Sequence, residues 1–536
     1  MTQKQRNLVG GISLLGIAGL ICKVIGVLFR IPLAQIIAPS GMGIYQQVFP
    51  TYNLLLTISS AGIPVAISRS VSHCLAQNDP RNAKRVFRAS LILLTSLGTV
   101  VTLVLMLFYN DLASAKGTPE AALGYLYIAP SLLFVCVMSA FRGAMQGRRR
   151  MAPTAVSQLI EQVGKVAFAL PIASYMTNMG STPAEGFALG AAGALLGTSI
   201  AEAAALLYMA VRHYIGRNEL NAVVQDETKA PLSYKYLCLY IFRISIPITI
   251  GACIVPLAGE ADSFMLVNIM DQYMPSGEAL VSYGVYTGLV FPLINVPTAL
   301  AMAMSANLVP SISAGVARED KEFIRRESAT GLRIAFLIGL PCSIGMSMLS
   351  EPILTCLFGR SENYNAAQLA LGSELLTFSA LTILLFILVQ ATSGILQGLR
   401  KQRIPMYTLF AGVLCKVILN YTLVRDPAIN IHGAPFASLL CYAVSMLPNL
   451  YFVCKYTGLK LSPLELLVRP GLATAVMAGA LALARALIGD RRLNHSFTWL
   501  TIIILFAVVV FFIAALLFGA IKKSDLPGRL KKLARS

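Results

Sequence analysis

The chain has 536 residues, of which 56% are hydrophobic and only 12% are charged, and its formal net charge is +19. A soluble domain of this size would carry about a quarter charged residues, so the composition argues against a soluble protein. The positive charge lies in short loops between apolar runs and is not clustered with aromatic side chains, which argues against a nucleic-acid partner.

Apolar runs long enough to cross a bilayer follow one another along the whole chain, without the two-residue alternation of barrel strands. In hydrocarbon the backbone must satisfy its own hydrogen bonds, so these runs predict α-helices. We expect an all-α polytopic membrane protein with about 14 transmembrane helices, the first of them a retained helix rather than a signal peptide. The expected spans are roughly 9–38, 44–69, 87–109, 121–146, 153–177, 187–213, 236–262, 280–309, 330–350, 373–398, 405–424, 434–455, 469–488 and 498–521.

The loops between these spans differ sharply in charge. One alternate set, together with the two chain ends, holds about thirty Lys and Arg residues, whereas the other set holds about four. Cationic loops stay on the cytoplasmic side of the membrane, so we predict a multi-pass membrane protein with both termini in the cytoplasm.

The two halves of the chain repeat one another. The stretch "FRGAMQGRRRMAP" (141–153) shares its spacing of two glycines, a glutamine and an arginine with "TSGILQGLRKQRIP" (392–405), and "VFPTYN" (48–53) recurs as "VFPLIN" (290–295). We therefore predict two parallel six-helix lobes around a central cavity, which is a transporter architecture. A duplication kept for packing alone is the alternative. The predicted parts are an N-terminal lobe at 1–215, a cytoplasmic linker at 216–235, a C-terminal lobe at 236–460, two further helices at 461–521 and a basic cytoplasmic tail at 522–536.

Charges inside the predicted spans are candidate functional groups, because a charge at mid-bilayer is costly and usually faces a wet cavity. Lys23 and Arg30 lie two turns apart on one face of the first span, where they could bind an anion or pack against a buried acid. The seventh span carries Glu260 and Asp262 at roughly equivalent positions. These acids could bind a proton or sodium, pair with Arg30, or lie wet at the outer interface.

Further polar residues have two open interpretations. Glu161 and Lys165 of the fifth span have the spacing of a favourable helical ion pair, with Glu202 as another possible partner for Lys165, but they could instead contact substrate or a coupling ion. Asn53 and Asn295 could line the cavity or join helices. Arg69 and Arg142 fall at cytoplasmic helix ends, where they could set topology or gather an anionic headgroup.

Several chemistries lack their sequence signatures. The chain has no GxxxxGK[ST] motif, no HExxH motif and no CxxC pair among its ten cysteines. We expect no enzyme activity, no metal and no cofactor beyond possible proton or sodium coupling. A membrane-embedded polysaccharide polymerase or ligase is a less favoured reading, because no predicted outward loop is long enough to carry a catalytic group set.

The stretch "KVIGVLFRIPLAQIIAPSGMGIYQQVFPTYNLLLTISSAGIPVAISRSVS" resembles the polysaccharide-biosynthesis and stage V sporulation protein B branch of the multidrug/oligosaccharidyl-lipid/polysaccharide exporter superfamily. Its most specific parts are G-x-G-x-Y-Q at 41–46 and GIPVAISR at 62–69. It is also similar to the MurJ-type lipid II flippases, in which cavity arginines on helices 1, 2 and 8 bind a diphosphate-sugar headgroup. Lys23 matches the helix-1 cation, whereas Leu55 and Gly288 stand near the other two positions.

The resemblance implies a flippase in a bacterial cell membrane that moves lipid II or a related undecaprenyl-diphosphate sugar outward by alternating access. It would act in cell-wall or polysaccharide synthesis, either vegetative or sporulation-linked. Lys23, Arg30 and either Arg69 or Arg142 would then bind the diphosphate, and the last two helices would hold the prenyl tail. The alternative is a drug or cation antiporter of the same superfamily. The expected partners are the sugar lipid and membrane lipids, with the protein acting as a monomer.

Overall fold

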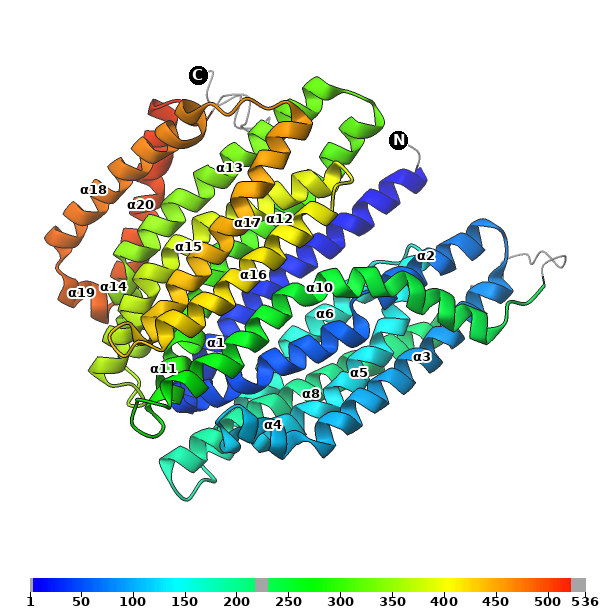
Figure 1. Cartoon of the computed structure of the whole chain (residues 1–536), viewed down its shortest axis with the longest axis horizontal. Coiled ribbons are helices and arrows are strands. Elements are labelled where there is room, and N and C mark those ends of the chain that lie inside the picture. The colour runs from blue at the N-terminus through cyan, green and yellow to red at the C-terminus, as the bar shows by residue number, and fades with distance from the viewer. Residues whose placement is uncertain (1–2, 217–229, 522–536) are drawn as a thin grey trace. The chain divides into compact units, whose positions relative to one another are not determined.

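The computed structural model describes residues 3–216 and 230–521, and all regular secondary structure within these ranges is helical (Figure 1). The expectation of an all-α membrane protein is confirmed. Helices satisfy the backbone within each segment, as spanning hydrocarbon requires. Most of the predicted linker (217–229) and the basic tail (522–536) lie outside the described residues, as does the very start of the chain.

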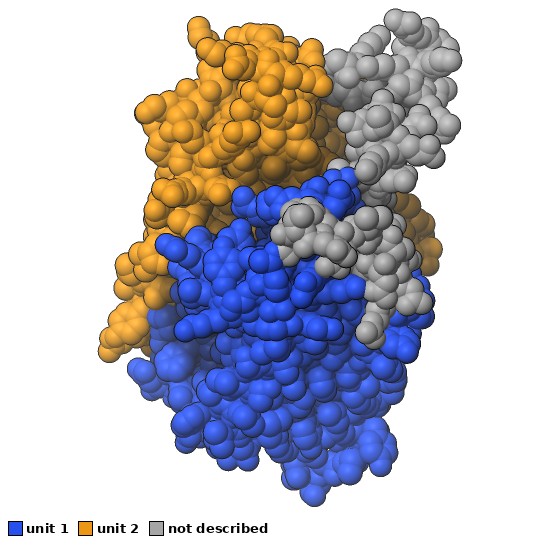
Figure 2. Space-filling model, turned by 90° about the vertical axis from the view of Figure 1, so that its right-hand side faces the viewer, with its two compact units in different colours: residues 1–288 blue, residues 289–536 orange. Residues whose placement is uncertain are grey.

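The chain forms two compact units, residues 1–288 and residues 289–536, which Figure 2 colours blue and orange. The predicted lobe boundaries and the two-fold relation between lobes stay predictions. In unit 1 the seventh predicted span, now α10, packs against helices that precede it in the chain. The elements of unit 1 are α1 (Gln3–Ser60), α2 (Ile63–Ala76), α3 (Pro80–Leu107), α4 (Tyr109–Ala115), η1 (Pro119–Ala121), α5 (Ala122–Gly147), α6 (Ala152–Gly164), η2 (Lys165–Ala169), α7 (Leu170–Thr177), α8 (Pro183–Ile215), α10 (Tyr234–Met270) and α11 (Glu278–Gly284). The π-helix η3 (Val285–Val290) begins in unit 1 and ends in unit 2.

Unit 2 contains the remaining helices. Its last two long helices, α18 and α20, match the expected final pair of spans and pack against each other around a buried apolar cluster that includes Met477 and Phe511. The elements of unit 2 are α12 (Phe291–Ala317), α13 (Lys321–Met348), α14 (Ser350–Phe358), α15 (Ala366–Gly398), α16 (Arg403–Val424), η4 (Asn430–His432), α17 (Gly433–Thr457), η5 (Leu464–Val468), α18 (Arg469–Ile488), α19 (Asp490–His495) and α20 (Phe497–Leu517).

Helix α1 contains two helices joined at a kink. Ala38 has φ 59° and ψ 177°, outside the helical region, and Pro39 follows it. Proline disfavours helical geometry in the residue before it, so the sequence accounts for a break at this position. The second predicted span is itself interrupted between Ser60 and Ile63. There a Cβ on Gly62 would lie 2.4 Å from the backbone oxygen of Ser245, so only glycine allows α10 to approach this break.

Twelve described helical segments are long and apolar enough to span a membrane. The predicted count of fourteen is not confirmed. The first of the twelve, Ile21–Ala76, contains the second predicted span and the later part of the first, and the fifth predicted span is divided among α6, η2 and α7.

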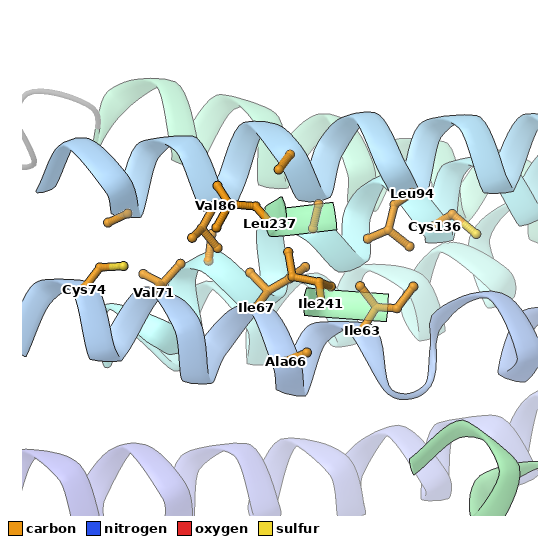
Figure 3. Close-up of a cluster of buried hydrophobic side chains, with 14 residues drawn as sticks. Ile63, Ala66, Ile67, Val71, Cys74, Val86, Leu94, Cys136, Leu237 and Ile241 are labelled. Atoms are coloured by element: carbon orange, nitrogen blue, oxygen red, sulfur yellow. The ribbon is translucent and has the colours of Figure 1, made fainter. Parts of the chain in front are cut away.

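An apolar cluster holds one side of unit 1 together (Figure 3). Ile67 of α2, Val86 of α3, Cys136 of α5 and Ile241 of α10 are all fully buried or nearly so. Burying apolar side chains between four helices makes them one packed body, so α10 is a structural part of this unit.

The repeated sequence motif has the same local structure in both units. Gly147 faces α2 and Gly398 faces α12, where added Cβ atoms would lie 2.8 and 3.0 Å from backbone oxygens. Arg149 and Arg400 then adopt left-handed conformations, with φ 62° and 60°. In each copy the following amide donates a hydrogen bond to the carbonyl five residues earlier, at 2.9 and 2.8 Å. The motif thus encodes close helix packing followed by a defined helix end.

Candidate functional site

The first half of α1 carries both cations predicted in span 1. Lys23 is exposed, whereas Arg30 is half-buried, with its Cζ 5.7 Å from the centre of the Phe49 ring. Phe49 lies beyond the kink in the same element and stacks on Tyr45, with ring centres 5.5 Å apart. The Arg30 guanidinium therefore makes a cation–π contact with Phe49, in the second half of α1.

Arg30 forms no ion pair with any described acidic residue. The cation–π contact offsets only part of the cost of withdrawing a guanidinium from water. A half-buried cation without a carboxylate partner is suited to an anionic ligand. Among the predicted cations of this unit, Arg30 combines this lack of an ion pair with a cation–π contact.

Arg142 is one such cation, and it is paired. Its Nη2 lies 3.1 Å from Oε1 of Glu161, and its Nε donates a hydrogen bond to Ser157 Oγ at 2.9 Å. The expected pairing of Glu161 with Lys165 is therefore replaced by an ion pair between α5 and α6. Lys165 instead opens the π-helical turn η2, which shifts the register of the helix at that residue.

Glu202 of α8 is a buried acid close to this region. Its side chain is 3% exposed, and Oε1 accepts a hydrogen bond of 2.7 Å from the Tyr52 hydroxyl. Its Oε2 has no hydrogen-bond partner among the described residues. The sequence offered Glu202 as a partner for Lys165, and the structure gives it a phenol as its hydrogen-bond partner.

The pair of acids on α10 is divided between two environments. Asp262 is buried, and Glu260 forms an ion pair with Lys116, with Oε1 2.8 Å from Nζ. The suggested pairing of Glu260 with Arg30 is thus not the one formed. Burial lowers the pKa of Lys116, while the Glu260 carboxylate acts in the opposite direction.

Sequence reasoning missed Lys116. It lies between α4 and η1, in one of the loops that carry few cations. A lysine in such a loop is unusual, and this was the one feature of the sequence that could have drawn attention to it. Its burial depends on α10, which lies far away in sequence, so local pattern does not reveal it.

The remaining predicted residues lie apart from these contacts. Arg69 on α2 and Asn53 on α1 are exposed, and their side chains form no hydrogen bond or ion pair with a described residue. Asn295 is exposed on α12 and belongs to unit 2. The structure therefore groups Arg30, Tyr45, Phe49 and Tyr52 with Glu202, and leaves the predicted roles of Arg69, Asn53 and Asn295 as predictions.

Comparison with known proteins agrees with this fold. Residues 8–316 match the family described as "Polysaccharide biosynthesis protein", and residues 247–422 match the MatE family. The lipid II flippase MurJ of Bacillus subtilis is 26% identical over 469 residues, covering 84% of this chain and 83% of its own. Stage V sporulation protein B of the same organism is 25% identical over 440 residues, covering 81% of each chain.

A solved structure shows the same fold. The lipid II flippase MurJ in an inward closed conformation has a TM-score of 0.69 at 12% identity, covering 96% of this chain and 99% of its own. At this identity the likeness concerns the fold alone.

Proposed function

Because this chain belongs to the polysaccharide biosynthesis protein family, we propose that it is a flippase for a lipid-linked oligosaccharide. The chain is a multi-pass membrane protein of the superfamily that contains flippases and multidrug transporters. The substrate class is lipid II or a related undecaprenyl-diphosphate sugar, moved across the bacterial plasma membrane by alternating access. Relatives that bear the names lipid II flippase and stage V sporulation protein support this choice.

The observation that carries the proposal is the unpaired charge of Arg30. A lipid-linked diphosphate has a headgroup too polar for hydrocarbon, and its negative charge needs cations inside the membrane. Arg30 is half-buried, faces aromatic rings and has no described acidic partner, whereas Arg142 and Lys116 are neutralised by carboxylates. Guanidinium groups bind phosphate oxygens with directional, charge-assisted hydrogen bonds, so Arg30 is the residue we assign to the diphosphate, with Lys23 on the same face.

The direction of transport follows from charge. An inside-negative membrane potential favours outward movement of an anion by about 2.3 kcal/mol per charge per 100 mV. This contribution needs no coupling ion. The half-buried Phe49, which stacks on the buried Tyr45, gives an aromatic ring on which a sugar can pack while the prenyl chain stays in lipid.

The test is flipping of fluorescent lipid II in proteoliposomes. Losing a hydrogen bond to a charged group costs about 1.5–3 kcal/mol, so Arg30→Ala should slow flipping by about tenfold or more. Lys23→Ala should also slow it. The matched control is Arg425→Ala in unit 2, because Arg425 makes a similar cation–π contact, with its Cζ 5.6 Å from the centre of the Tyr421 ring.

Flipping that is unchanged in both Lys23→Ala and Arg30→Ala would remove the assigned site. The same vesicles discriminate the other function considered for this superfamily. Export of organic cations, with no flipping of any prenyl-linked sugar, would identify the chain as a cation antiporter.

A further inference from the structure

The side chain of Lys116 is completely buried and surrounded by oxygen atoms. Its Nζ lies 2.8 Å from Glu260 Oε1, 2.8 Å from Thr51 Oγ1, 2.8 Å from Ser263 Oγ and 3.0 Å from the Gln47 backbone oxygen. Two of these ligands come from α1 and two from α10. The lysine itself comes from neither helix, because it belongs to the loop between α4 and η1.

The hydrogen bonds around this group are directed so that oxygen lone pairs face Nζ. The Thr51 hydroxyl donates to both Glu260 carboxylate oxygens at 3.0 Å, and the Ser263 hydroxyl donates to the Glu260 backbone oxygen at 3.0 Å. With their protons used in this way, both hydroxyls can only accept from Lys116. An ammonium has three protons and no lone pair, so four acceptors around Nζ match a cation and not a neutral amine.

Neighbouring groups complete the surroundings of the ligands without competing for Nζ. The Tyr125 hydroxyl donates to the Gln47 oxygen at 2.8 Å, and the ring lies 6.0 Å from the lysine nitrogen. Glu260 retains a side-chain exposure of 18% against 0% for Lys116, so the carboxylate is the member of this group that water can reach.

One carboxylate, two hydroxyls and one backbone carbonyl form an all-oxygen ligand set with a single negative charge. Hard metal cations prefer such ligands, and one negative charge suits a monovalent ion. We propose that Lys116 is a tethered cation that occupies a monovalent-cation site between α1 and α10, and that sodium binds this site once the lysine side chain is removed. In the intact protein the ammonium holds the two helices together without a dissolved ion, so Glu260 is not available for sodium coupling.

The test is thermal unfolding of the purified full chain in detergent, at constant ionic strength, with sodium exchanged for choline. Wild-type protein should show the same midpoint in both salts. Lys116→Ala leaves an unpaired carboxylate and space beside it. Its midpoint should fall by several degrees in choline and recover as sodium is added, with a saturating dependence, because an ion that binds only the folded state stabilises it.

Two matched variants isolate the ion. Lys116→Met fills the space of the lysine stem without the charge, so it should be destabilised in both salts and sodium should not restore it. Lys116→Ala/Glu260→Gln removes both charges and should be insensitive to the exchange. Lys455→Met removes an exposed lysine of α17 in unit 2 and controls for loss of a positive charge.

The proposal fails if wild-type stability depends on sodium, or if Lys116→Ala responds equally to sodium and choline. It also fails if Lys116→Ala does not fold in sodium while the double variant does, since sodium would then be unable to replace the ammonium. None of these results depends on flipping activity, so they leave the proposed function independently testable.

Discussion

Arg30, Arg142 and Lys116 are three cations within one unit, and each meets a different environment. Arg142 is paired with Glu161 and Lys116 with Glu260, whereas Arg30 makes a cation–π contact with Phe49 and no ion pair with a described acidic residue. The sequence identified Arg30 because it interrupts an apolar run, and Arg142 because it falls at the cytoplasmic end of a predicted helix. It could not assign their partners. Glu161 lies four residues before Lys165 on the same stretch of helix, yet it pairs with Arg142 of another helix.

Asp271, just beyond the end of α10, gives a prediction that depends on pH. Burial and the nearby Glu120 carboxylate raise the pKa of Asp271. A raised folded-state pKa means that the folded protein binds the proton more tightly than the unfolded chain. The charged form therefore lowers stability above that pKa, and the penalty disappears as pH falls through it. Asp271→Asn should raise the thermal midpoint near neutral pH by a small amount that shrinks in acid.

Glu120→Gln is the companion variant, because it removes the repelling charge and leaves Asp271 in place. It should reproduce part of the gain, and the double variant should gain less than the sum of the two. A stabilisation by Asp271→Asn that stays constant across the acid range would rule out this electrostatic origin.

At the scale of single elements, hydrophobic runs predicted where helices lie but not how they are interrupted. The kink at Ala38 could have been predicted, because Pro39 follows it. However, α1 contains two more internal prolines and only one break of this kind, so a proline alone does not locate a kink. The π-helical turn at Lys165 has no proline and no glycine within it. Such turns depend on packing with neighbouring helices, so hydropathy alone does not reveal them.

The structure also contains a repeated element that was not predicted. Asn78 and Glu319 end α2 and α12 in left-handed conformations, with φ 53° and 56°. Asp79 and Asp320 follow them and cap the next helices by accepting an amide hydrogen bond at 2.9 Å in each case. Most of the amino acids at these positions differ between the two turns, so the sequence comparison did not reveal that the turns correspond. Both units therefore use the same turn between equivalent helices.

The glycines of the first repeat provide a test of packing at this scale. Gly147→Ala and Gly398→Ala would each bring a Cβ to within 3 Å of a neighbouring helix, so helices must separate at a cost of about 1–3 kcal/mol. Gly479→Ala in α18 is the matched control, because no atom lies within 4 Å of its added Cβ. It should be neutral or stabilising by up to about 1 kcal/mol, since alanine is the better helix former.

Thermal unfolding in detergent measures all three variants. Equal midpoints for Gly147→Ala and Gly479→Ala would mean that the tight approach of α5 to α2 contributes nothing to stability. A loss in one copy of the repeat only would show that the two units use the motif for different purposes.

For the whole molecule, composition predicted the class and most of the helices, because a bilayer leaves few alternatives for a long apolar run. The internal repeat predicts that residues 236–262 begin the second lobe, and this boundary stays a prediction. The sequence does not reveal which helices α10 packs against, because its buried cluster is shared with α2, α3 and α5, which lie far from it along the chain.

The predicted topology can be tested with single cysteines. The ten native cysteines are free, so a cysteine-less background needs no disulfide to be replaced. Arg149→Cys and Gln402→Cys should be modified only from the cytoplasmic side, and Met179→Cys and Ser276→Cys only from outside, because positive loops are retained in the cytoplasm. All four positions are exposed. Labelling of the two pairs from one side would overturn the orientation.

The four oxygen ligands of Lys116 also have a consequence for the order of events during biosynthesis. Gln47 and Thr51 are made before the lysine, but the Ser263 hydroxyl lies 147 residues after it. Until α10 has entered the bilayer, a nascent chain carries an ammonium that has only half of its final ligands. The insertion of α10 must therefore precede the closure of this junction, and the four oxygen ligands of Lys116 are complete only after residues 260–263 have been made.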